Sequence, residues 1–214
     1  SLIRKYLNAG VMIKGEYAKT TMGTPQGGNI SPLLSNIMLN ELDRELEARG
    51  LRFVRFADDC VIAVGSSAAA NRVMASVTGF IEKKLGLKVN ASKSKVTKPM
   101  NLKYLGFGFW KDKDRWKARP HKDSIKRFER KLKAKTKRNW SVSIDQRIAE
   151  LNQLIRGWIN SFRMGNMKST LRRIDEHLRT RMRIVIWKQW KTSARRYWGL
   201  RKLGAPEWIA RKSV

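Results

Sequence analysis

A run of apolar residues with helical spacing follows Ser31. Its members recur at steps of three and four residues: Leu34, Ile37, Met38, Leu42 and Leu46. This spacing predicts an amphipathic helix from Ser31 to about Arg49. We expect Ser31 to be its N-cap, Pro32 to be its first helical residue and Gly50 to end it.

Two short apolar runs after this helix are typical of β-strands. They span Phe53–Phe56 and Cys60–Val64, and they predict a hairpin with Asp58 and Asp59 at or beside its turn. Two adjacent carboxylates repel each other, and a bound divalent cation is the usual reason for such a pair. Mg²⁺ suits this position because it takes hard oxygen ligands from one or two carboxylates and from substrate phosphates. The alternative is a plain polar hairpin tip, since Asp also favours turns.

The rest of the first half continues the alternation of helices and strands. A helix is predicted from about residue 68 to residue 85, followed by short extended pieces at 87–89 and 96–97. A pair of strands is expected at 102–106 and 107–110. Together these elements predict an α+β arrangement with an antiparallel sheet.

The second half shows three helical stripes of apolar residues. The first contains Ile125, Phe128 and Leu132, the second runs from Ile144 to Phe162, and the third lies within 171–187. Ser143 and Gln146 are spaced as a capping box at the start of the second helix. Three such helices predict a small all-α bundle whose stripes form its core.

Charge and tryptophan content divide the chain near residue 115. Residues 1–110 carry a net charge of +8 and residues 111–214 a net charge of +22, and seven of the eight tryptophans fall at or after Trp116. The polar run 111–115 is therefore expected to be a turn or linker. We expect domains at 1–114 and 115–194, followed by a basic tail at 195–214.

The overall charge identifies the class of partner. The 214 residues carry a formal net charge of +30, which gives sequence-independent affinity for phosphate backbones. The densest cations stripe the first helix of the second half and predict an RNA-binding surface: Lys126, Arg127, Arg130, Lys131, Lys133, Lys135, Lys137 and Arg138. The alternative for such a run is an ordinary solvated face.

Cysteine and histidine content argues against disulfides and zinc sites. Cys60 is the sole cysteine, and His121 and His177 are far apart in the sequence, so we expect both histidines on helix surfaces. The sequence shows no membrane-spanning run and no signal peptide pattern, and a cytoplasmic location is expected. The chain begins at Ser1 without a methionine, and we expect it to be part of a longer protein.

Five blocks in order resemble the reverse transcriptases encoded by group II introns. GTPQGGNISPLLSNIMLNELD (23–43) resembles the block with the substrate-cradling loop, and FVRFADD (53–59) resembles the YADD block. GLKVNASKS (86–94) and YLGF (104–107) are similar to the next block and to the primer grip that ends the palm. GWINSFR (157–163) resembles the hallmark of the maturase domain, also called X or thumb.

The resemblance implies a partial palm followed by a maturase domain. Asp58 would be a catalytic carboxylate that binds Mg²⁺ in a two-metal site, and Asp59 would be its supporting neighbour. The incoming nucleotide and templating base would be bound by Pro25, Gln26 and Gly27, with Lys93 near the triphosphate. The primer end would be positioned by Tyr104, Leu105 and Gly106.

The resemblance also implies the partners of the protein. They are a group II intron RNA, an RNA template with its DNA primer and, in the complete enzyme, a deoxynucleoside triphosphate. Basic thumb helices would grip RNA through its shape, and Trp140, Trp190, Trp198 and Trp208 are candidates for stacking on bases. Trp158 and Trp187 fall on apolar stripes and are expected in the core.

The sequence departs from the family at two points. Phe56 stands where tyrosine is usual, which keeps the aromatic ring and loses a hydroxyl. The family's third carboxylate lies upstream of the Gly-rich loop, where Glu16 is the only acidic residue and does not match that motif; no fingers segment is found either. We therefore expect the 214 residues alone not to polymerise DNA.

Other functions remain open from the sequence. The chain could be a non-catalytic RNA-binding splicing cofactor or a degenerate remnant of an intron-encoded protein. Retention of Asp58 and Asp59 beside an intact Gln26 loop favours a polymerase lineage. A diversity-generating or retron enzyme is disfavoured by the GWINSFR element and the long basic thumb.

Overall fold

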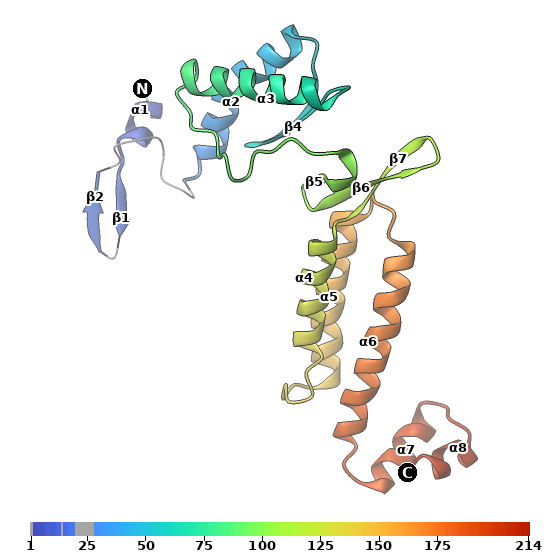
Figure 1. Cartoon of the computed structure of the whole chain (residues 1–214). Helices are drawn as coiled ribbons and strands as arrows, with labels where there is room; N and C mark the ends of the chain where they lie inside the picture. Colours follow the sequence, from blue (N-terminus) through green and yellow to red (C-terminus); the bar gives the residue numbers. More distant parts are fainter. Residues whose placement is uncertain (1, 14, 20–27) are drawn as a thin grey trace. The chain divides into compact units, whose positions relative to one another are not determined.

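The computed structural model describes residues 2–13, 15–19 and 28–214. These residues form two compact units that divide between Thr97 and Lys98. Each unit is described by itself (Figure 1).

The first unit combines helices with two small hairpins. Its helices are α1 (Leu2–Leu7), α2 (Ser31–Ala48) and α3 (Ser67–Lys83), and its strands are β1 (Val11–Ile13), β2 (Glu16–Ala18), β3 (Arg52–Phe56) and β4 (Asp59–Ala63). Both strand pairs are antiparallel. The predicted helices and the predicted hairpin are confirmed to within a few residues.

The start of α2 differs from the prediction. The helix begins at Ser31 itself, and the N-cap is Ile30, which makes no side-chain cap hydrogen bond. The predicted Ser31 cap is therefore wrong by one residue. Pro32 is tolerated in this first turn because amide groups there have no acceptor within the helix. Gly50 follows the helix with a φ of +65°.

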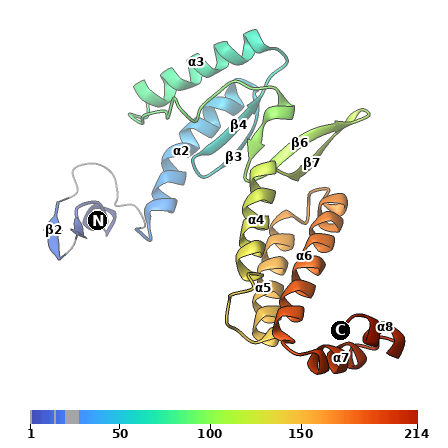
Figure 2. The ribbon, with the colours of Figure 1, turned by 60° about the horizontal axis from the view of Figure 1, so that its bottom comes forward.

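Helices α2 and α3 cover one face of the β3–β4 hairpin. Leu42, Leu46 and Val77 form a buried cluster, and the hairpin contributes Phe53 and Ile62, which are paired across the strands. Figure 2 shows α2 beside the two strands. This packing fixes which residues of β3 point toward the helices.

The opposite face of the hairpin exposes apolar side chains between Arg52 and Asp59. Val54 and Phe56 alternate with the inward residues and are 60% and 64% exposed. An exposed apolar sheet face favours association. We therefore expect this chain to self-associate.

The segment between α3 and the second unit contains no strand. Residues 87–89 and 96–97 are fully described and lie in irregular structure, so the predicted extended pieces do not pair. Short apolar runs of two or three residues are weak strand signals.

The second unit opens with a short 3₁₀ turn, η1 (Pro99–Asn101), and a three-stranded antiparallel sheet. Its strands are β5 (Lys103–Tyr104), β6 (Phe107–Asp112) and β7 (Arg115–Pro120), in the order β5-β6-β7. The prediction missed β7, and the polar run 111–115 is the turn of the β6–β7 hairpin. The predicted boundary at 114/115 therefore falls inside this hairpin. The basic residues at every second position of Arg115–Pro120 hid a period of two, in which Ala118 and Pro120 are turned inward.

Three long helices follow the sheet and form a bundle (Figures 1 and 2). They are α4 (Lys122–Lys135), α5 (Ile144–Phe162) and α6 (Lys168–Gln189). Phe128, Leu132, Leu151 and Ile174 form the buried cluster between them. The Ser143 hydroxyl accepts a hydrogen bond from the Gln146 amide at the start of α5, which confirms the predicted cap.

Aromatic rings connect the bundle to the sheet. Trp158 stacks on Phe128 with ring centroids 4.4 Å apart, and Phe162 lies 5.0 Å from Trp158 and 4.9 Å from Phe107 of β6. Aromatic pairs at such distances add to the burial of their surfaces. The core prediction for Trp158 is confirmed, and the sheet and the bundle share one aromatic column.

Two short helices end the chain: α7 (Ser193–Lys202) and α8 (Glu207–Lys212). Trp187 and Trp190 of the α6 end lie 6.3 Å apart, and a Cβ added to Gly199 would meet the Trp190 ring at 2.5 Å. Trp190 therefore packs on α7. Of the helices in the described ranges, none has the length and apolar character needed to cross a membrane.

His121 caps α4 and gives the second unit a pH dependence. Its Nδ1 accepts a hydrogen bond from the Asp123 amide. Burial lowers the pKa of His121, Asp123 opposes this, and Lys103, Lys122 and Arg119 lower it further. A histidine with a lowered pKa in the folded state destabilises that state as the pH falls below about 6.5.

We predict that His121→Asn removes this pH dependence, because asparagine can cap a helix without titrating. All eight tryptophans belong to the second unit, so tryptophan fluorescence during urea unfolding reports on it selectively. The free energy of unfolding of the parent chain should fall more steeply between pH 7.5 and pH 5.5 than that of the variant. Parallel pH profiles for the two proteins would contradict the assignment.

Candidate active site and nucleic-acid interface

The adjacent aspartates lie at the tight turn of the β3–β4 hairpin. Ala57 and Asp58 form the two-residue connection, and Asp59 is the first residue of β4, paired with Phe56. Both aspartates are exposed. Ala57 has a φ of +53°, a left-handed conformation that costs a non-glycine residue free energy. The turn is confirmed, and its strain marks a site where the surrounding contacts hold the backbone.

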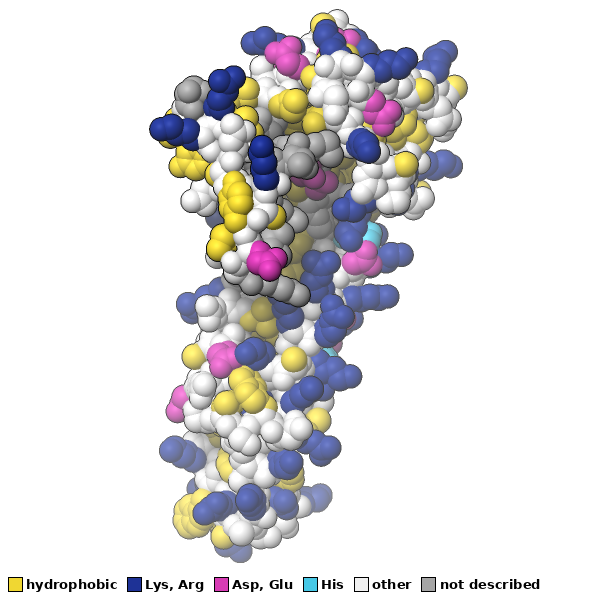
Figure 3. Space-filling model, turned by 90° about the vertical axis from the view of Figure 1, so that its left-hand side faces the viewer, with side chains coloured by type: hydrophobic (Ala, Val, Ile, Leu, Met, Phe, Trp, Pro, Cys, Tyr) yellow, Lys and Arg dark blue, Asp and Glu magenta, His cyan; other side chains and the backbone are white. Residues whose placement is uncertain are grey.

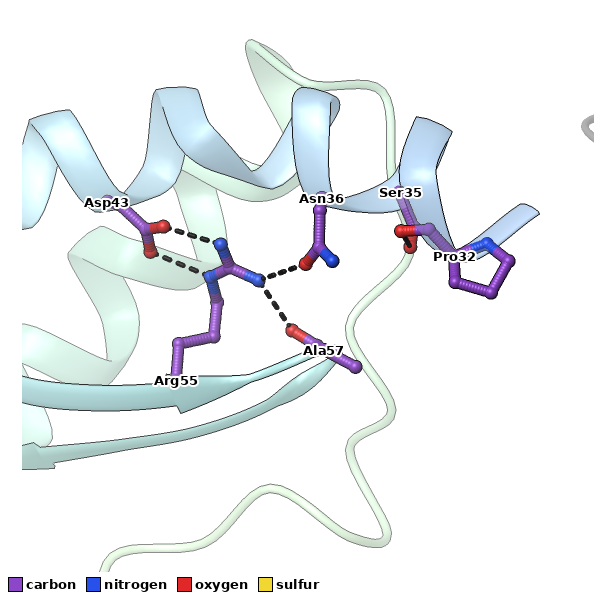
Figure 4. A network of polar contacts seen from close by, with 6 residues as sticks. All are labelled: Pro32, Ser35, Asn36, Asp43, Arg55 and Ala57. Carbon is purple, nitrogen blue, oxygen red and sulfur yellow. Dashed lines mark hydrogen bonds and ion pairs between the residues drawn. The ribbon is translucent and has the colours of Figure 1, made fainter. Parts of the chain in front are cut away.

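Arg55 supplies those contacts (Figure 4). Its guanidinium donates to both carboxylate oxygens of Asp43 on α2, at 2.7 and 2.5 Å. Its Nη1 also donates to Asn36 Oδ1 and to the Ala57 carbonyl, both at 2.9 Å. A bidentate arginine–carboxylate pair is strong and directional. The aspartate turn is thereby tied to the helix that follows the Gly-rich segment.

Sequence reasoning missed Arg55 and Asp43, although a signal was present. Arg55 shares its strand parity with Phe53, so it points toward α2 rather than toward solvent. A charged side chain on the inward face of an apolar strand requires a partner. Asp43 follows the core residue Leu42 and is the carboxylate within reach.

Cys60 lies beside this cluster and is not a reactive thiol. It is a free cysteine that packs against the first-unit core. Burial raises the pKa of the thiol, Asp43 raises it further, and Arg55 opposes both. The thiol is therefore protonated at neutral pH, and thiolate chemistry is not expected there.

The donor set at the turn suits part of a Mg²⁺ site. Two exposed carboxylates leave room for the water and phosphate oxygens that Mg²⁺ retains. Within the described residues, no group of three or more His, Cys, Asp or Glu side chains converges on one point. Mg²⁺ binding by Asp58 and Asp59 stays a prediction.

The predicted nucleotide-binding residues are described only in part. Pro25, Gln26 and Gly27 lie outside the described residues. Lys93 is exposed in a turn that Asn90 organises, because the Asn90 side-chain oxygen accepts from the Lys93 amide at 3.2 Å. The Lys93 side chain is thus accessible to an anion.

The predicted primer grip is the two-residue turn between β5 and β6. Tyr104 pairs with Phe107, while Leu105 and Gly106 have φ values of +49° and +82°, as a type I′ turn requires. The Leu105 side chain is 45% exposed, although its backbone is held in this left-handed conformation. The Gly106 carbonyl accepts from the Ser124 hydroxyl and the His121 amide, each at 2.9 Å. The turn belongs to the second unit, whereas Asp58 and Asp59 belong to the first.

The predicted basic surface on α4 is only partly a helix face. Five cations are exposed along the length of the helix: Lys126, Arg127, Arg130, Lys131 and Lys133. Lys135 is half-buried and pairs with Glu150. The last two cations, Lys137 and Arg138, lie beyond the end of the helix. In Figure 3, Lys and Arg side chains spread along the visible face of the helical unit with few acidic side chains among them.

The tryptophans predicted to stack on bases have different environments. Trp198 and Trp208 are 68% and 69% exposed and remain candidates. Trp190 packs on Gly199 of α7. Two cations lie over the Trp140 ring, Arg147 at 4.7 Å and Lys135 at 4.8 Å from its centroid, so this ring is already engaged within the protein.

Comparison with known families identifies the class of this protein. Residues 1–109 match the reverse transcriptase (RNA-dependent DNA polymerase) family, and residues 125–204 match the group II intron maturase-specific domain. The chain therefore belongs to the reverse transcriptases, in the branch encoded by group II introns. The resemblance found in the sequence motifs is confirmed, as is the α+β palm followed by a helical maturase domain.

Relatives from bacteria and yeast support this assignment. The chain is 32% identical over 130 residues to Protein YkfC of Escherichia coli, covering 45% of this chain and 34% of that protein. It is 50% identical over 54 residues to the group II intron-encoded protein LtrA of Lactococcus lactis, covering 25% and 9%. It is 24% identical over 238 residues to the putative COX1/OXI3 intron 2 protein of Saccharomyces cerevisiae, covering 84% and 28%. The chain spans about a third or less of each relative.

We predict that Arg55→Met loosens the aspartate turn. Loss of the guanidinium leaves the Asp43 carboxylate without its bidentate partner and frees the Ala57 carbonyl. Since the pair is largely but not fully buried, a cost of about 2 kcal/mol is expected, below that of a fully buried pair. Hydrogen exchange of the amides of residues 56–60 should accelerate at least tenfold.

The matched control is Arg52→Met, which removes the same charge from the same strand at an exposed position. It should leave exchange at 56–60 nearly unchanged. Equal acceleration in both variants would mean that charge, rather than the Arg55 contacts, stabilises the turn.

Proposed function

We propose that this chain is the palm end and maturase portion of a group II intron-encoded protein that copies intron RNA into DNA and assists its splicing. Residues 1–114 would carry the polymerase residues, residues 115–194 the maturase domain, and residues 195–214 a basic tail that contacts nucleic acid. The reverse transcriptase match over residues 1–109 and the maturase match over residues 125–204 support the order of the first two parts, and the maturase match extends past residue 194 into the basic tail.

RNA binding is the activity that this chain supports best by itself. The observation that carries it is the exposed, acid-poor line of Lys126, Arg127 and Arg130 on α4, within the maturase match. Cations on a rigid helix suit the phosphates and 2′-hydroxyls by which RNA shape is recognised. The partner would be a group II intron RNA and, during copying, the duplex of template and primer.

The polymerase residues would act at the β3–β4 turn. Asp58, supported by Asp59, would bind Mg²⁺, which supplies activation of a primer 3′-hydroxyl and stabilisation of the leaving pyrophosphate. Lys93 would contact the triphosphate, and Pro25, Gln26 and Gly27 would line the nucleotide pocket. The strained turn of Tyr104, Leu105 and Gly106 would hold the primer end.

We predict that the 214-residue chain does not extend a DNA primer on an RNA template in Mg²⁺. Asp58 and Asp59 supply two carboxylates, and the third required by the family has no match before the Gly-rich loop. The measurement is a primer-extension assay with labelled primer, alongside the Asp58→Asn variant. Extension by the parent chain that Asp58→Asn abolishes would refute this prediction.

We predict that the triple change Lys126→Gln, Arg127→Gln and Arg130→Gln weakens RNA binding and flattens its salt dependence. Each lost phosphate contact changes the slope of log affinity against log salt by about 0.7 to 0.9, so a total change of about 2.1 to 2.7 is expected if all three cations contact phosphates. Affinities for a group II intron RNA and for an unrelated structured RNA are measured by titration at several salt concentrations.

The control is the triple change Lys83→Gln, Lys88→Gln and Lys95→Gln, which removes the same charge from exposed positions of the first unit. A preference for the intron RNA that persists at high salt and depends on the α4 residues supports the proposed function. Equal effects of the two triple variants would leave only generic phosphate binding.

A further inference from the structure

The segment that ends α4 and leads into α5 is strongly cationic. We call residues 133–140 the α4–α5 turn. They contain Lys133, Lys135, Lys137 and Arg138 and no acidic residue. A segment of this charge is expected to repel itself and move freely unless other contacts hold it. Two arginines from the other helices provide such contacts.

Arg147 of α5 is fully buried and binds the backbone of the turn. Its Nη1 donates to the carbonyls of Lys135 and Lys137, at 2.6 and 3.2 Å, and its Nη2 donates to the Trp140 carbonyl at 2.7 Å. Burial lowers the pKa of Arg147, and Glu150 opposes this. A guanidinium still remains charged at neutral pH, so the turn is built around a buried cation.

Arg181 of α6 holds the same segment from another helix. Its Nε donates to the Thr136 hydroxyl at 2.6 Å, and its Nη2 donates to the carbonyls of Thr136 and Lys133 at 3.1 and 3.2 Å. Thr136 is buried, and its hydroxyl donates in turn to the Leu132 carbonyl at 2.7 Å. The threonine hydroxyl is thus satisfied as both donor and acceptor.

These contacts determine what the lysines of the turn can do. The last carbonyls of a helix lack partners within it and carry partial negative charge, which basic side chains often neutralise. Here Arg147 and Arg181 bind these carbonyls, so the lysines of the turn do not. Lys133, Lys137 and Arg138 are consequently exposed. Their positions are fixed because the two arginines donate five hydrogen bonds to backbone carbonyls of the turn and one to the Thr136 hydroxyl.

We propose that the α4–α5 turn is a preorganised RNA-contact element and that Arg147 and Arg181 are its positioning residues. The proposal rests on the RNA-binding function proposed above. Fixing the cations before binding lowers the entropy lost on association, and fixed spacing lets a basic surface discriminate one RNA shape from another. The two arginines act through the turn and do not themselves contact RNA.

The first test compares Arg181→Met with Arg179→Met. Arg179 lies on the same helix, is 68% exposed and pairs with Asp175, so both variants lose one charge. Binding to a transcribed group II intron RNA is titrated across salt, well below the unfolding temperature of each variant. Arg181→Met should weaken binding about tenfold and flatten the salt slope by more than about 1, the equivalent of more than one phosphate contact. Arg179→Met should change the affinity and the salt slope by no more than the loss of one phosphate contact would.

A second test removes no charge. Thr136→Val deletes the hydroxyl that accepts from Arg181 and keeps the shape of the side chain. It should flatten the salt slope and accelerate hydrogen exchange at residues 136–140, although every cation is retained. It also serves as the test if Arg181→Met fails to fold.

A double-mutant cycle decides whether Arg181 acts through the turn. In a background carrying Lys137→Gln and Arg138→Gln, Arg181→Met should cause little further loss of RNA affinity. Additive losses, equal effects of Arg181→Met and Arg179→Met, or an unchanged salt slope in Thr136→Val would overturn the proposal. If the triple variant on α4 has no effect on RNA binding, the proposed function itself is wrong. If the triple variant weakens binding as expected while Arg181→Met and Thr136→Val do not, the proposed function stands and only the role of the α4–α5 turn is wrong.

Discussion

Inward-facing arginines fix the turns on which the proposed chemistry depends. Arg55 binds Asp43 and the strained turn that carries Asp58, while Arg147 and Arg181 bind the backbone of the α4–α5 turn. A planar guanidinium offers five donors in a fixed geometry, so it can hold several oxygens at once where a lysine ammonium cannot. In this strongly basic chain, such arginines serve as internal supports and exposed lysines supply much of the outward charge.

A second constraint links the primer-grip turn to the maturase helices. The column of Phe107, Phe162, Trp158 and Phe128 runs from β6 into the bundle core, and the Gly106 carbonyl is held by the start of α4. A Cβ at Gly106 would crowd Phe162 and Ser124, each at 3.2 Å. The palm-like sheet and the thumb-like bundle of the second unit are therefore one packed body, and the GWINSFR block supports both.

Much of the fold could be predicted from residue patterns, and the errors have local physical causes. Helical spacing placed α2, α3, α4, α5 and α6 because burial of one stripe repeats every three or four residues. The cap of α2 was misplaced by one residue because Ser31 and Pro32 are both compatible with neighbouring positions of the first turn. The strand β7 was missed because its outward residues are charged, and the pairing of a charged strand depends on its neighbour β6.

The sequence by itself determined the family, the helical stripes and the positions of Asp58, Asp59 and the basic residues, because these follow from local order along the chain. Only the tertiary structure decided which cations and rings are available. Arg147 and Lys135 both lie over the Trp140 ring, Lys135 pairs with Glu150, and Arg55 turns toward Asp43. These pairings join residues between 5 and 15 positions apart in the sequence through packing, and residue composition cannot distinguish a cation that binds the protein's own backbone from one left exposed for RNA.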